Sequence, residues 1–225
     1  MTGPGYSVMD SRKLHVSYPE DFGAEFHWRE MRRTALLVSR ESPLVDIGCG
    51  SGLISQLIQS KVSYVGIDFN PNYLASNWKG RPVDGKIGGN VLRLPFQDSS
   101  FRTALLLHVI EHFPAEKQIL LLREAYRVLS RRGRLIISTP NLDTLRNADR
   151  FLPPNNPKHF HCLHLQELRI LLEEAGFQEV HRHGFDVVIE YPNRLLKMIP
   201  EGVRRQAAQS ISKLEKHLIF TAERP

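Results

Sequence analysis

The sequence predicts an α/β protein with a doubly wound, mostly parallel sheet of seven strands and helices on both faces. Short apolar runs rich in β-branched residues alternate with stretches of helical periodicity, which is the pattern of parallel strands joined by crossover helices. A glycine-rich loop, Gly48–Gly52, follows the first of these apolar runs. Because such sheets bind their ligands at the carboxyl ends of the strands, we expect the functional residues just after each strand.

The expected elements follow one another along the chain. Strands are predicted at Leu44–Ile47, Ser63–Asp68, Lys86–Ile87, Thr103–Leu107, Leu135–Ser138, Glu179–His183 and His217–Phe220. Helices are predicted over Asp21–Arg40, Leu53–Gln59, Pro71–Trp78, Ala115–Leu129 and Leu165–Ala175. Gly133 and Gly176 stand where helix-ending glycines are expected. Between Asn193 and His217 apolar residues recur at helical spacing, and Pro200 with Gly202 divides that stretch into two helices.

The composition is that of a globular protein. Of 225 residues, 41% are hydrophobic and 24% are charged, which excludes a disordered or collagen-like chain and favours a single domain, residues 1–225. Lys and Arg number 30 against 24 Asp and Glu, and this surplus permits a nucleic acid, an anionic membrane surface or an anionic substrate without selecting one. The two cysteines show neither disulfide nor zinc spacing, and no apolar run has the length of a signal peptide or a membrane span. We therefore expect a cytoplasmic protein with no transmembrane segment.

The glycine loop and a distant acid predict a nucleotide-type ligand. The loop reads Asp46-Ile47-Gly48-Cys49-Gly50-Ser51-Gly52, and its glycines allow the backbone to turn tightly and approach a ligand closely. The next strand ends on Asp68, where a carboxylate would reach the hydroxyl pair of a ribose. An ordinary tight turn would explain the glycines alone, but it would not explain the acid at the end of the next strand.

These residues and an ordered series of later motifs resemble class I S-adenosylmethionine-dependent methyltransferases. The resemblance covers about residues 25–183, and its segments are Val45–Gly52, Gly66–Asn70, Gly89–Phe96, His108–Phe113, Glu124–Leu129, Gly133–Asn141 and Leu168–Phe177. Within the class, the chain is similar to small-molecule and sugar methyltransferases and to ubiquinone-biosynthesis O-methyltransferases. The resemblance implies that the last strand enters the sheet antiparallel. It also implies an N-terminal arm and helix (1–40), a cofactor-binding core (41–183), and acceptor-side helices with the last strand (184–225).

The resemblance implies a set of residues around S-adenosylmethionine. The glycine-loop backbone would lie against the methionine and ribose, Asp46 would orient the loop or reach the ammonium, and Asp68 would accept both ribose hydroxyls. Phe69 would cover the adenine, and Asn90, where the family usually has Asp, would reach the adenine amino group. His108 would lie at the methionine end, and Arg32 would either hold the carboxylate or belong to a solvated helix face. The expected cofactor-binding residues are Arg32, Asp46, Gly48, Cys49, Gly50, Gly52, Asp68, Phe69, Asn90, Val91 and His108.

Histidines after two strands provide candidates for proton transfer. His112 and His161 are the expected catalytic bases, with Glu111 beside the first, because the pKa of a histidine lies near neutrality. The segment His108–His112 also matches an inverted zinc-protease motif, but that motif needs a helix, whereas a strand runs directly into His108.

A divalent metal is a second interpretation of the same histidines. Ubiquinone-biosynthesis and small-RNA 2′-O-methyltransferases carry an acid where this chain has His108, and His159, His161 or His164 could complete a site. We favour the alternative that Glu111 and His112 face the substrate as a hydrogen-bonding pair and hold no metal.

The predicted activity is methyl transfer from S-adenosylmethionine to a hydroxyl, or less readily an amine, of a small molecule. The fold would hold acceptor, methyl group and sulfur in line, and a histidine would assist removal of the proton. The alternatives are an RNA 2′-O-methyltransferase with a Glu/His metal site and a non-catalytic cofactor-binding protein. Nucleic acid is disfavoured because no dense basic run interleaved with aromatic residues is present. The stretch between Asn193 and His217 has an apolar stripe and a surplus of basic residues. We expect it to pack over the acceptor pocket rather than on a membrane surface.

Overall fold

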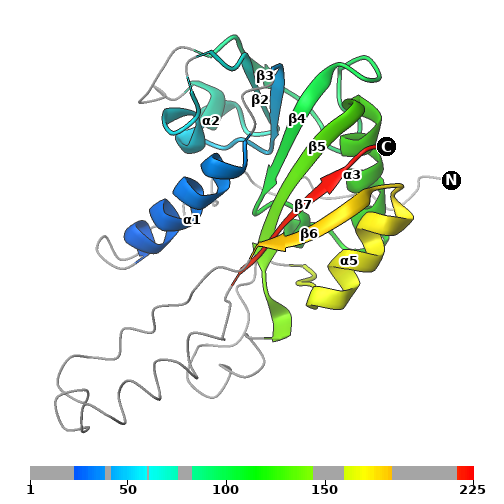
Figure 1. Ribbon diagram of the computed structural model, residues 1–225. Coiled ribbons are helices and arrows are strands. Elements are labelled where there is room, and N and C mark those ends of the chain that lie inside the picture. The colour runs from blue at the N-terminus through cyan, green and yellow to red at the C-terminus, as the bar shows by residue number, and fades with distance from the viewer. Residues whose placement is uncertain (1–22, 39–41, 60, 76–82, 144–159, 184–216) are drawn as a thin grey trace, which may run out of the picture.

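One seven-stranded sheet organises the computed structural model, which describes residues 23–38, 42–59, 61–75, 83–143, 160–183 and 217–225 (Figure 1). Its strands are β1 (Leu44–Ile47), β2 (Tyr64–Asp68), β3 (Gly85–Gly88), β4 (Phe101–Leu107), β5 (Leu129–Pro140), β6 (Gln178–His183) and β7 (His217–Glu223). The strand order is β3-β2-β1-β4-β5-β7-β6. Strands β1 to β5 pair in parallel, and β7 runs antiparallel to β5 and β6. The predicted fold class, including the antiparallel last strand, is confirmed.

Helices cover both faces of this sheet. The helices are α1 (Gly23–Leu37), α2 (Pro71–Ala75), α3 (Ala115–Val128) and α5 (Leu165–Glu174), with two short 3-10 turns, η2 (Leu53–Gln56) and η3 (Ile110–His112). Figure 1 shows α3 and α5 together on one side of the sheet and α1 on the other. The central strands β1, β2 and β4 are mostly buried because helices cover both of their faces, whereas the edge strands β3 and β6 are half-buried to exposed.

Alternate residues of the strands point to opposite faces of the sheet and pack in two separate hydrophobic cores. Val45 and Ile47 of β1 pack in the larger core, which also takes the apolar faces of α3 and α5. Leu44 and Leu105 point to the opposite face and pack with Met31 of α1 in the smaller core. This division follows from the two-residue period of a strand. It places α1 directly over the face onto which the side chain of Asp46, two residues after Leu44, also projects.

Two of the sequence predictions, on the helix after the glycine loop and on Gly133, differ from the structure. The stretch after the glycine loop forms only the 3-10 turn η2 and does not continue as a helix to Gln59. Gly133 does not end a helix: α3 already ends at Val128, and Gly133 lies within β5, where a Cβ would come within 2.7 Å of the Ser130 carbonyl oxygen. Gly176 does follow α5 with a φ of 101°, as a helix-ending glycine should. The two predicted C-terminal helices lie in 184–216, outside the described residues.

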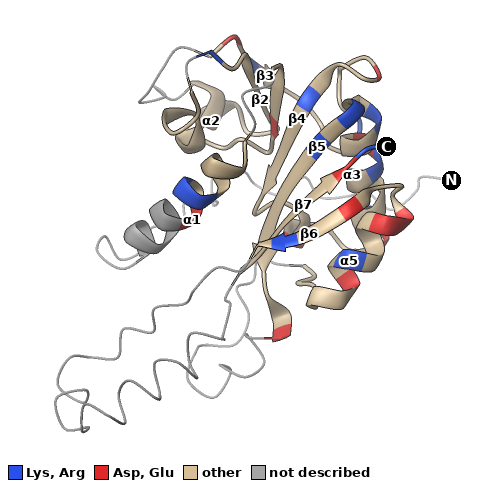
Figure 2. Ribbon diagram, in the orientation of Figure 1, with Lys and Arg blue, Asp and Glu red and all other residues tan. Residues whose placement is uncertain are grey.

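Charged residues of both signs occur along the helices that cover one face of the sheet. Figure 2 shows Lys and Arg as well as Asp and Glu along the ribbon of α3 and of α5. No helix among the described residues is long and apolar enough to cross a membrane.

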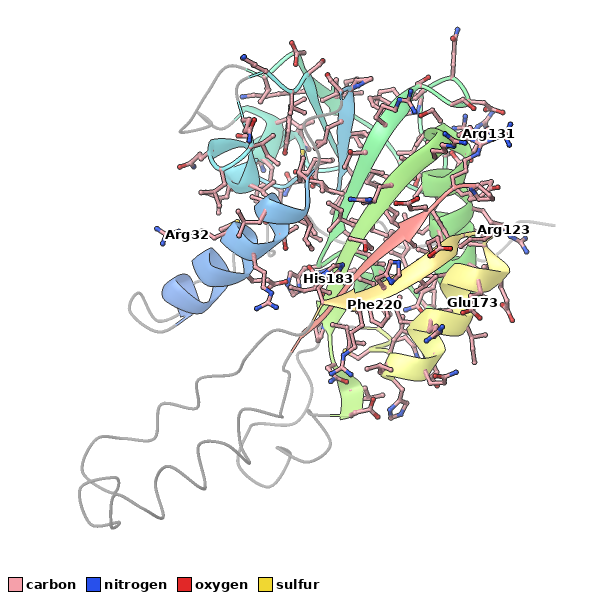
Figure 3. All side chains as sticks on the ribbon, viewed as in Figure 1. Arg32, Arg123, Arg131, Glu173, His183 and Phe220 are labelled. Atoms are coloured by element: carbon pink, nitrogen blue, oxygen red, sulfur yellow. The ribbon has the colours of Figure 1, made fainter. Side chains whose placement is uncertain are left out.

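Side chains join the antiparallel strand β7 to both of its neighbours. His183 of β6 and Phe220 of β7 lie on adjacent strands in Figure 3. The Nε2 atom of His183 lies 2.8 Å from the hydroxyl of Thr221, and Arg134 of β5 donates to Glu223 over 2.7 Å. The last strand is therefore fixed by polar contacts on both sides as well as by its backbone ladder.

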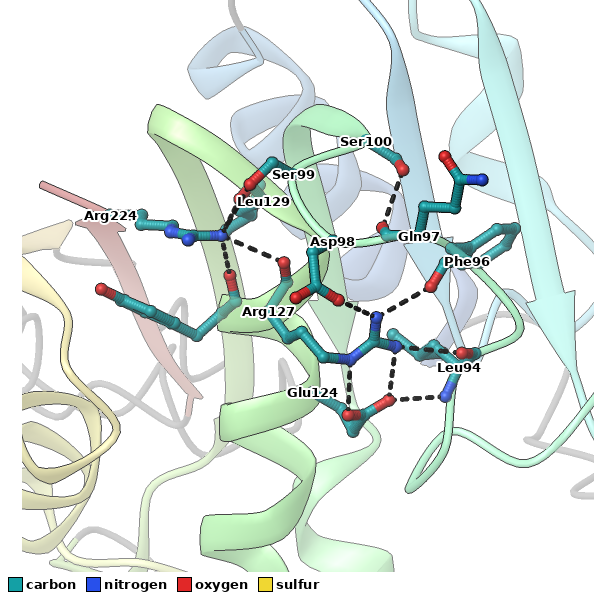
Figure 4. Close-up of polar contacts among 11 residues, drawn as sticks. Leu94, Phe96, Gln97, Asp98, Ser99, Ser100, Glu124, Arg127, Leu129 and Arg224 are labelled. Atoms are coloured by element: carbon teal, nitrogen blue, oxygen red, sulfur yellow. Dashed lines mark hydrogen bonds and ion pairs between the residues drawn. The ribbon is translucent and has the colours of Figure 1, made fainter.

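Arg127, near the end of α3, anchors the segment that connects β3 to β4 (Figure 4). Its guanidinium donates to both carboxylate oxygens of Glu124, to Asp98 at 2.7 Å, and to the carbonyls of Phe96 and Leu94 at 2.8 and 3.0 Å. Glu124 in turn accepts a hydrogen bond from the Leu94 backbone N–H at 2.7 Å. The planar guanidinium of Arg127 thus holds Leu94, Phe96 and Asp98 of the connecting segment against α3.

Arg224 fixes the chain just after β7 in a similar way. Its guanidinium donates to the carbonyls of Tyr126, Arg127 and Leu129 at the junction of α3 and β5 (Figure 4). It also lies 4.8 Å from the centre of the Tyr126 ring, which is a cation–π distance.

Candidate functional site

A cleft lies where the strand order of the sheet reverses, between β1 and β4. We call it the switch-point cleft, because ligands of open α/β sheets bind at such reversals. Its volume is about 280 Å³. Its walls come from α1, β1, the glycine loop, η2, α2, and the ends of β4 and β5, and the lining residues are Glu30, Met31, Thr34, Asp46, Gly48, Cys49, Gly50, Ser51, Leu53, Ile54, Tyr73, Leu107, His108 and Ser138.

The glycine loop forms the floor of the cleft through backbone conformations that favour glycine. Gly48, Gly50 and Gly52 have φ values of 76°, 51° and 69°. A Cβ on Gly48 would come within 2.5 Å of Val109, whereas one on Gly50 would meet nothing within 4 Å. The open space above Gly50 leaves the backbone accessible to a ligand, as the predicted cofactor site requires.

Asp68 stands at the end of β2, beside the loop. Its Oδ2 accepts from the Gly50 N–H at 2.9 Å, and its Oδ1 accepts from the Asn70 N–H at 2.8 Å. These contacts hold the 5% exposed carboxylate next to the cleft. Each oxygen of a carboxylate can accept a second hydrogen bond, so the group fits a ribose hydroxyl pair.

Asp46 is buried in the cleft wall and accepts a hydrogen bond from the Tyr64 hydroxyl. Burial raises the pKa of Asp46 to about 7; the negative charge of Asp68 adds to this rise, and the Tyr64 hydrogen bond opposes it. The sequence predicted Asp46 at this place, and the structure adds that its charge changes near neutral pH.

Glu30, His108 and Glu111 form a buried triad above the loop. Glu30 reaches from α1 with oxygens 2.8 and 2.9 Å from Nε2 of His108, and Glu111 lies 3.2 Å from Nδ1. Glu30 is 2% exposed and Glu111 is fully buried, and Glu111 also accepts from the Thr139 hydroxyl at 3.1 Å. Sequence reasoning missed Glu30, although it stands two residues before Arg32, for which a role was predicted.

The two carboxylates keep the imidazole of His108 protonated. Burial lowers the pKa of His108, but the charges of Glu30 and Glu111 and their hydrogen bonds outweigh it, so the pKa lies well above its ordinary value. Burial likewise raises the pKa of Glu111, and the contact with His108 reverses this and leaves it lowered. The triad is therefore two carboxylates around one imidazolium.

Glu111 consequently holds a supporting position. Its side chain has no exposure and does not line the cleft, so it orients His108 rather than facing a ligand. Its carbonyl accepts from the backbone N–H groups of Phe160 and His161 at 2.8 and 3.2 Å. Gln118 donates to the His161 carbonyl at 2.8 Å and to the Ile110 carbonyl at 3.1 Å. These bonds bring the segments of both candidate bases together next to the triad.

His112 and His161 are both half-buried, and neither lines the switch-point cleft. His112 ends η3, four residues after His108. His164 caps the N-terminus of α5, with its Nδ1 2.5 Å from Asp143, and His159 lies outside the described residues. In the part of the chain that the structure describes, no group of three or more His, Cys, Asp or Glu side chains is arranged to hold a metal ion.

The remaining predicted cofactor residues occupy varied positions. Phe69 is 59% exposed just past β2, free to cover a flat ligand, and Cys49 lines the cleft with its thiol neutral because burial raises its pKa. The side-chain oxygen of Asn90 accepts from the Leu92 N–H at 2.9 Å, and Val91 is buried in the larger core. These last two residues therefore support the turn that would border the ligand.

Arg32 is not brought to the cleft. Its side chain is exposed and lines a different hollow, between α1 and the segment 57–62 that follows η2, and Figure 3 shows it directed away from the sheet. Glu30 and Thr34, which share a different face of α1, line the cleft instead. The helix thus presents an acid, rather than the predicted cation, to the ligand side.

Comparison with known proteins agrees with this geometry. Residues 45–137 match the family described as "Methyltransferase domain". A Mycobacterium tuberculosis protein named "Probable S-adenosylmethionine-dependent methyltransferase Rv3030" is 32% identical over 171 residues, which are 73% of this chain and 60% of that protein. The demethylmenaquinone methyltransferase of Thermotoga maritima is 29% identical over 61% of this chain and 56% of its own length. The chain thus spans less than two thirds of these curated relatives.

Solved structures share the fold. A SAM-dependent methyltransferase from Archaeoglobus fulgidus superposes with a TM-score of 0.64 at 20% identity, covering 88% of this chain and 93% of that one. The ordered motifs, the strand order and the matched family together place this chain among the class I S-adenosylmethionine-dependent methyltransferases.

Proposed function

We propose that this protein transfers a methyl group from S-adenosylmethionine to a hydroxyl group of a small molecule. The observation that carries the proposal is the glycine loop at the floor of the switch-point cleft, with Asp68 held beside it by the Gly50 N–H. When bound, S-adenosylmethionine supplies an already activated methyl group on a positive sulfur. The protein has to bind the cofactor, orient the acceptor and accept a proton.

The residues of the chain divide these tasks. Asp68 accepts from the ribose hydroxyls, Phe69 covers the adenine, and the Gly48–Gly52 backbone lies along the amino-acid portion. Asp46, Glu30 and His108, which line the cleft, lie beside that portion. His112, or else His161, accepts the acceptor's proton, because both follow strands that end on the ligand side of the sheet.

A small-molecule acceptor is supported by the relatives. The Thermotoga maritima relative acts, by its name, on demethylmenaquinone, which is a small molecule. A hydroxyl is favoured over an amine because the chain resembles O-methyltransferases in its His108–Phe113 segment. We further propose a single working domain over 1–225, with its cofactor core in 41–183 and its acceptor side in 1–40 and 184–225.

RNA 2′-O-methylation is the second candidate for the same site. It draws on the Glu111-His112 pair and on the surplus of 30 basic over 24 acidic residues. The mixture of basic and acidic residues along α3 and α5 in Figure 2 favours the small-molecule acceptor over it.

The proposal is tested by product release. The full chain is incubated with S-adenosylmethionine and, in separate reactions, with phenols, sugars, amines and small RNAs. Release of S-adenosylhomocysteine with a phenol or sugar supports the proposal. Release only with RNA supports the second candidate, and cofactor binding without release from any acceptor class contradicts methyl transfer to all of them.

A further inference from the structure

Two buried hydroxyl groups in the wall of the switch-point cleft have no hydrogen-bond partner among the described residues. They belong to Thr34 of α1 and Ser138 of β5, each 1% exposed, and both residues line the cleft. A threonine within a helix commonly donates to a carbonyl one turn earlier, but the Thr34 hydroxyl makes no such bond. A buried hydroxyl without a partner destabilises the folded chain, and a polar ligand group in the cleft would remove that cost.

Position, rather than burial alone, singles out these two hydroxyls. Buried side-chain oxygens without a partner also occur on Ser55, Thr103, Gln118 and Ser130, and none of these four residues lines the cleft. Thr103 is the clearest contrast, because its hydroxyl is equally buried. It pairs with Leu44 at the start of β1, at the opposite end of the strands from the glycine loop.

Both hydroxyls lie between α1 and the sheet, beside His108. Ser138 follows Ile136 by two residues and therefore projects from the same face of β5 as Ile136, which packs with α1 in the smaller core. The Ser138 carbonyl accepts from the backbone N–H of His108 at 2.9 Å. On the other side, Thr34 stands one turn after Glu30 on α1, and Glu30 lies 2.8 Å from Nε2 of His108. The two hydroxyls thus flank the His108 segment at the end of β4.

The order of the strands indicates which part of a ligand reaches these hydroxyls. The carboxyl ends of β2, β1, β4 and β5 lie next to one another along the sheet, and they carry Asp68, the glycine loop, His108 and Ser138 in that order. With its ribose at Asp68, a ligand that crosses the glycine loop has its opposite end at His108 and Ser138. In S-adenosylmethionine that end is the α-amino-acid group, whose ammonium donates hydrogen bonds and whose carboxylate accepts them. A hydroxyl can take either part.

We propose that the hydroxyls of Thr34 and Ser138 bind the α-amino-acid group of S-adenosylmethionine. This inference rests on the proposed function, and it gives the two residues a role in binding only. The product S-adenosylhomocysteine carries the same amino-acid group and therefore makes the same contacts. 5′-Methylthioadenosine has the adenine, the ribose and the sulfur but lacks the amino-acid group, so it contacts neither hydroxyl.

Calorimetry with these three ligands tests the assignment. Thr34→Val replaces the hydroxyl with a methyl group of similar size, and Ser138→Ala deletes it. We expect each variant to bind S-adenosylmethionine and S-adenosylhomocysteine about tenfold more weakly, which is the effect of losing one hydrogen bond to a charged group. Each should bind 5′-methylthioadenosine as the wild-type chain does. Thr34→Ser, which keeps the hydroxyl, should bind all three ligands like the wild-type chain.

Thr103→Val is the matched control, because it removes an equally buried and unpartnered hydroxyl outside the cleft. It should leave all three affinities unchanged. Urea unfolding without ligand checks the premise: since neither Thr34→Val nor Thr103→Val removes a hydrogen bond within the described part of the chain, both should be at least as stable as the wild-type chain.

Wild-type affinity for S-adenosylmethionine in Thr34→Val or in Ser138→Ala overturns the assignment of that residue. Equal weakening of all three ligands also overturns it, because it shows that the substitution changed the shape of the cleft. If one variant does not fold, the other decides by the same criterion. Failure of the wild-type chain to bind S-adenosylmethionine overturns the proposed function, and this inference with it.

Discussion

His112 is the residue on which the proposed proton transfer depends most. A hydroxyl attacks a sulfonium poorly while it keeps its hydrogen, and a base within reach typically contributes 10²–10⁴ in rate. We expect His112→Ala to lower kcat by at least roughly a hundredfold and to leave cofactor affinity nearly intact. The loss should shrink at high pH for a phenolic acceptor, which then ionises without help.

The control for this variant is His181→Ala, an exposed histidine on β6 at the edge of the sheet away from the cleft. Steady-state kinetics with the acceptor found by product release provide the measurement. If His112→Ala retains the wild-type kcat, His112 is not the base, and His161→Ala becomes the variant to measure.

Asp46 gives a prediction on the pH dependence of stability. Burial raises its pKa to about 7 in the folded chain, well above the ordinary value of an aspartate, so the folded state binds the proton more tightly. The stability that this proton provides is present below the unfolded pKa and is lost as the pH rises through 7. Between pH 5 and pH 7 the wild-type chain should lose about 2 kcal/mol relative to Asp46→Asn.

Urea unfolding of both proteins at several pH values measures this difference. The amide oxygen that replaces the carboxylate can still accept from the Tyr64 hydroxyl, so packing around Tyr64 should be preserved. Parallel curves for the two proteins between pH 5 and pH 7 would show that Asp46 is ionised in the folded chain throughout that range.

The elements that sequence patterns predicted well are those with strong periodicity. The alternation of Val45 and Ile47 with Leu44 follows directly from a strand covered on both faces. The extent of η2 could not be predicted, because its apolar residues fit one helical turn as well as two. Gly133 was misassigned because a glycine after a helix is typical of a helix end, whereas here it avoids a clash with the Ser130 carbonyl.

The triad of Glu30, His108 and Glu111 shows why part of the site could not be predicted from the sequence. Helical spacing identifies the buried face of α1, but it does not tell which polar residue of that face finds a partner. Glu30 and His108 are 78 positions apart, and only the packing of α1 over β4 brings them together. Arg32 matched a family pattern, yet the rotation of the helix directs it to the other side.

At the level of elements, the Arg127 cluster predicts a specific loss of stability. Arg127→Gln removes the guanidinium group that donates hydrogen bonds to Glu124, to Asp98 and to two backbone carbonyls of the segment before β4. The guanidinium is about a third exposed, so we expect a loss of about 2 kcal/mol in the free energy of unfolding, measured with urea. Arg123→Gln, on the exposed face of the same helix, should change it by less than about 0.5 kcal/mol. Equal effects would show that the cluster adds nothing beyond surface charge.

For the whole molecule, the strand order is the feature on which the site depends. The reversal between β1 and β4 opens the cleft, and residues from α1, α2, β4 and β5 close around it. The family resemblance predicted this arrangement, because an ordered series of motifs constrains topology more strongly than any single motif does. The Arg224 contacts that fix the end of β7 to the start of β5 carried no sequence signal, since they join residues 95 to 98 positions apart.

Since the cleft draws its walls from several elements, cofactor binding should stabilise the molecule as a whole. S-adenosylmethionine at about a hundred times its Kd should add about 2.7 kcal/mol and raise Tm by roughly 5–10 °C, measured by calorimetry. Asp68→Ala removes two charge-assisted hydrogen bonds to the ribose and should weaken binding by roughly 2–4 kcal/mol, so most of the rise should vanish at the same concentration. The exposed variant Glu174→Gln should keep the full rise. An undiminished rise in Asp68→Ala would place the ribose away from β2, because a ligand stabilises the fold only through contacts that the folded chain makes.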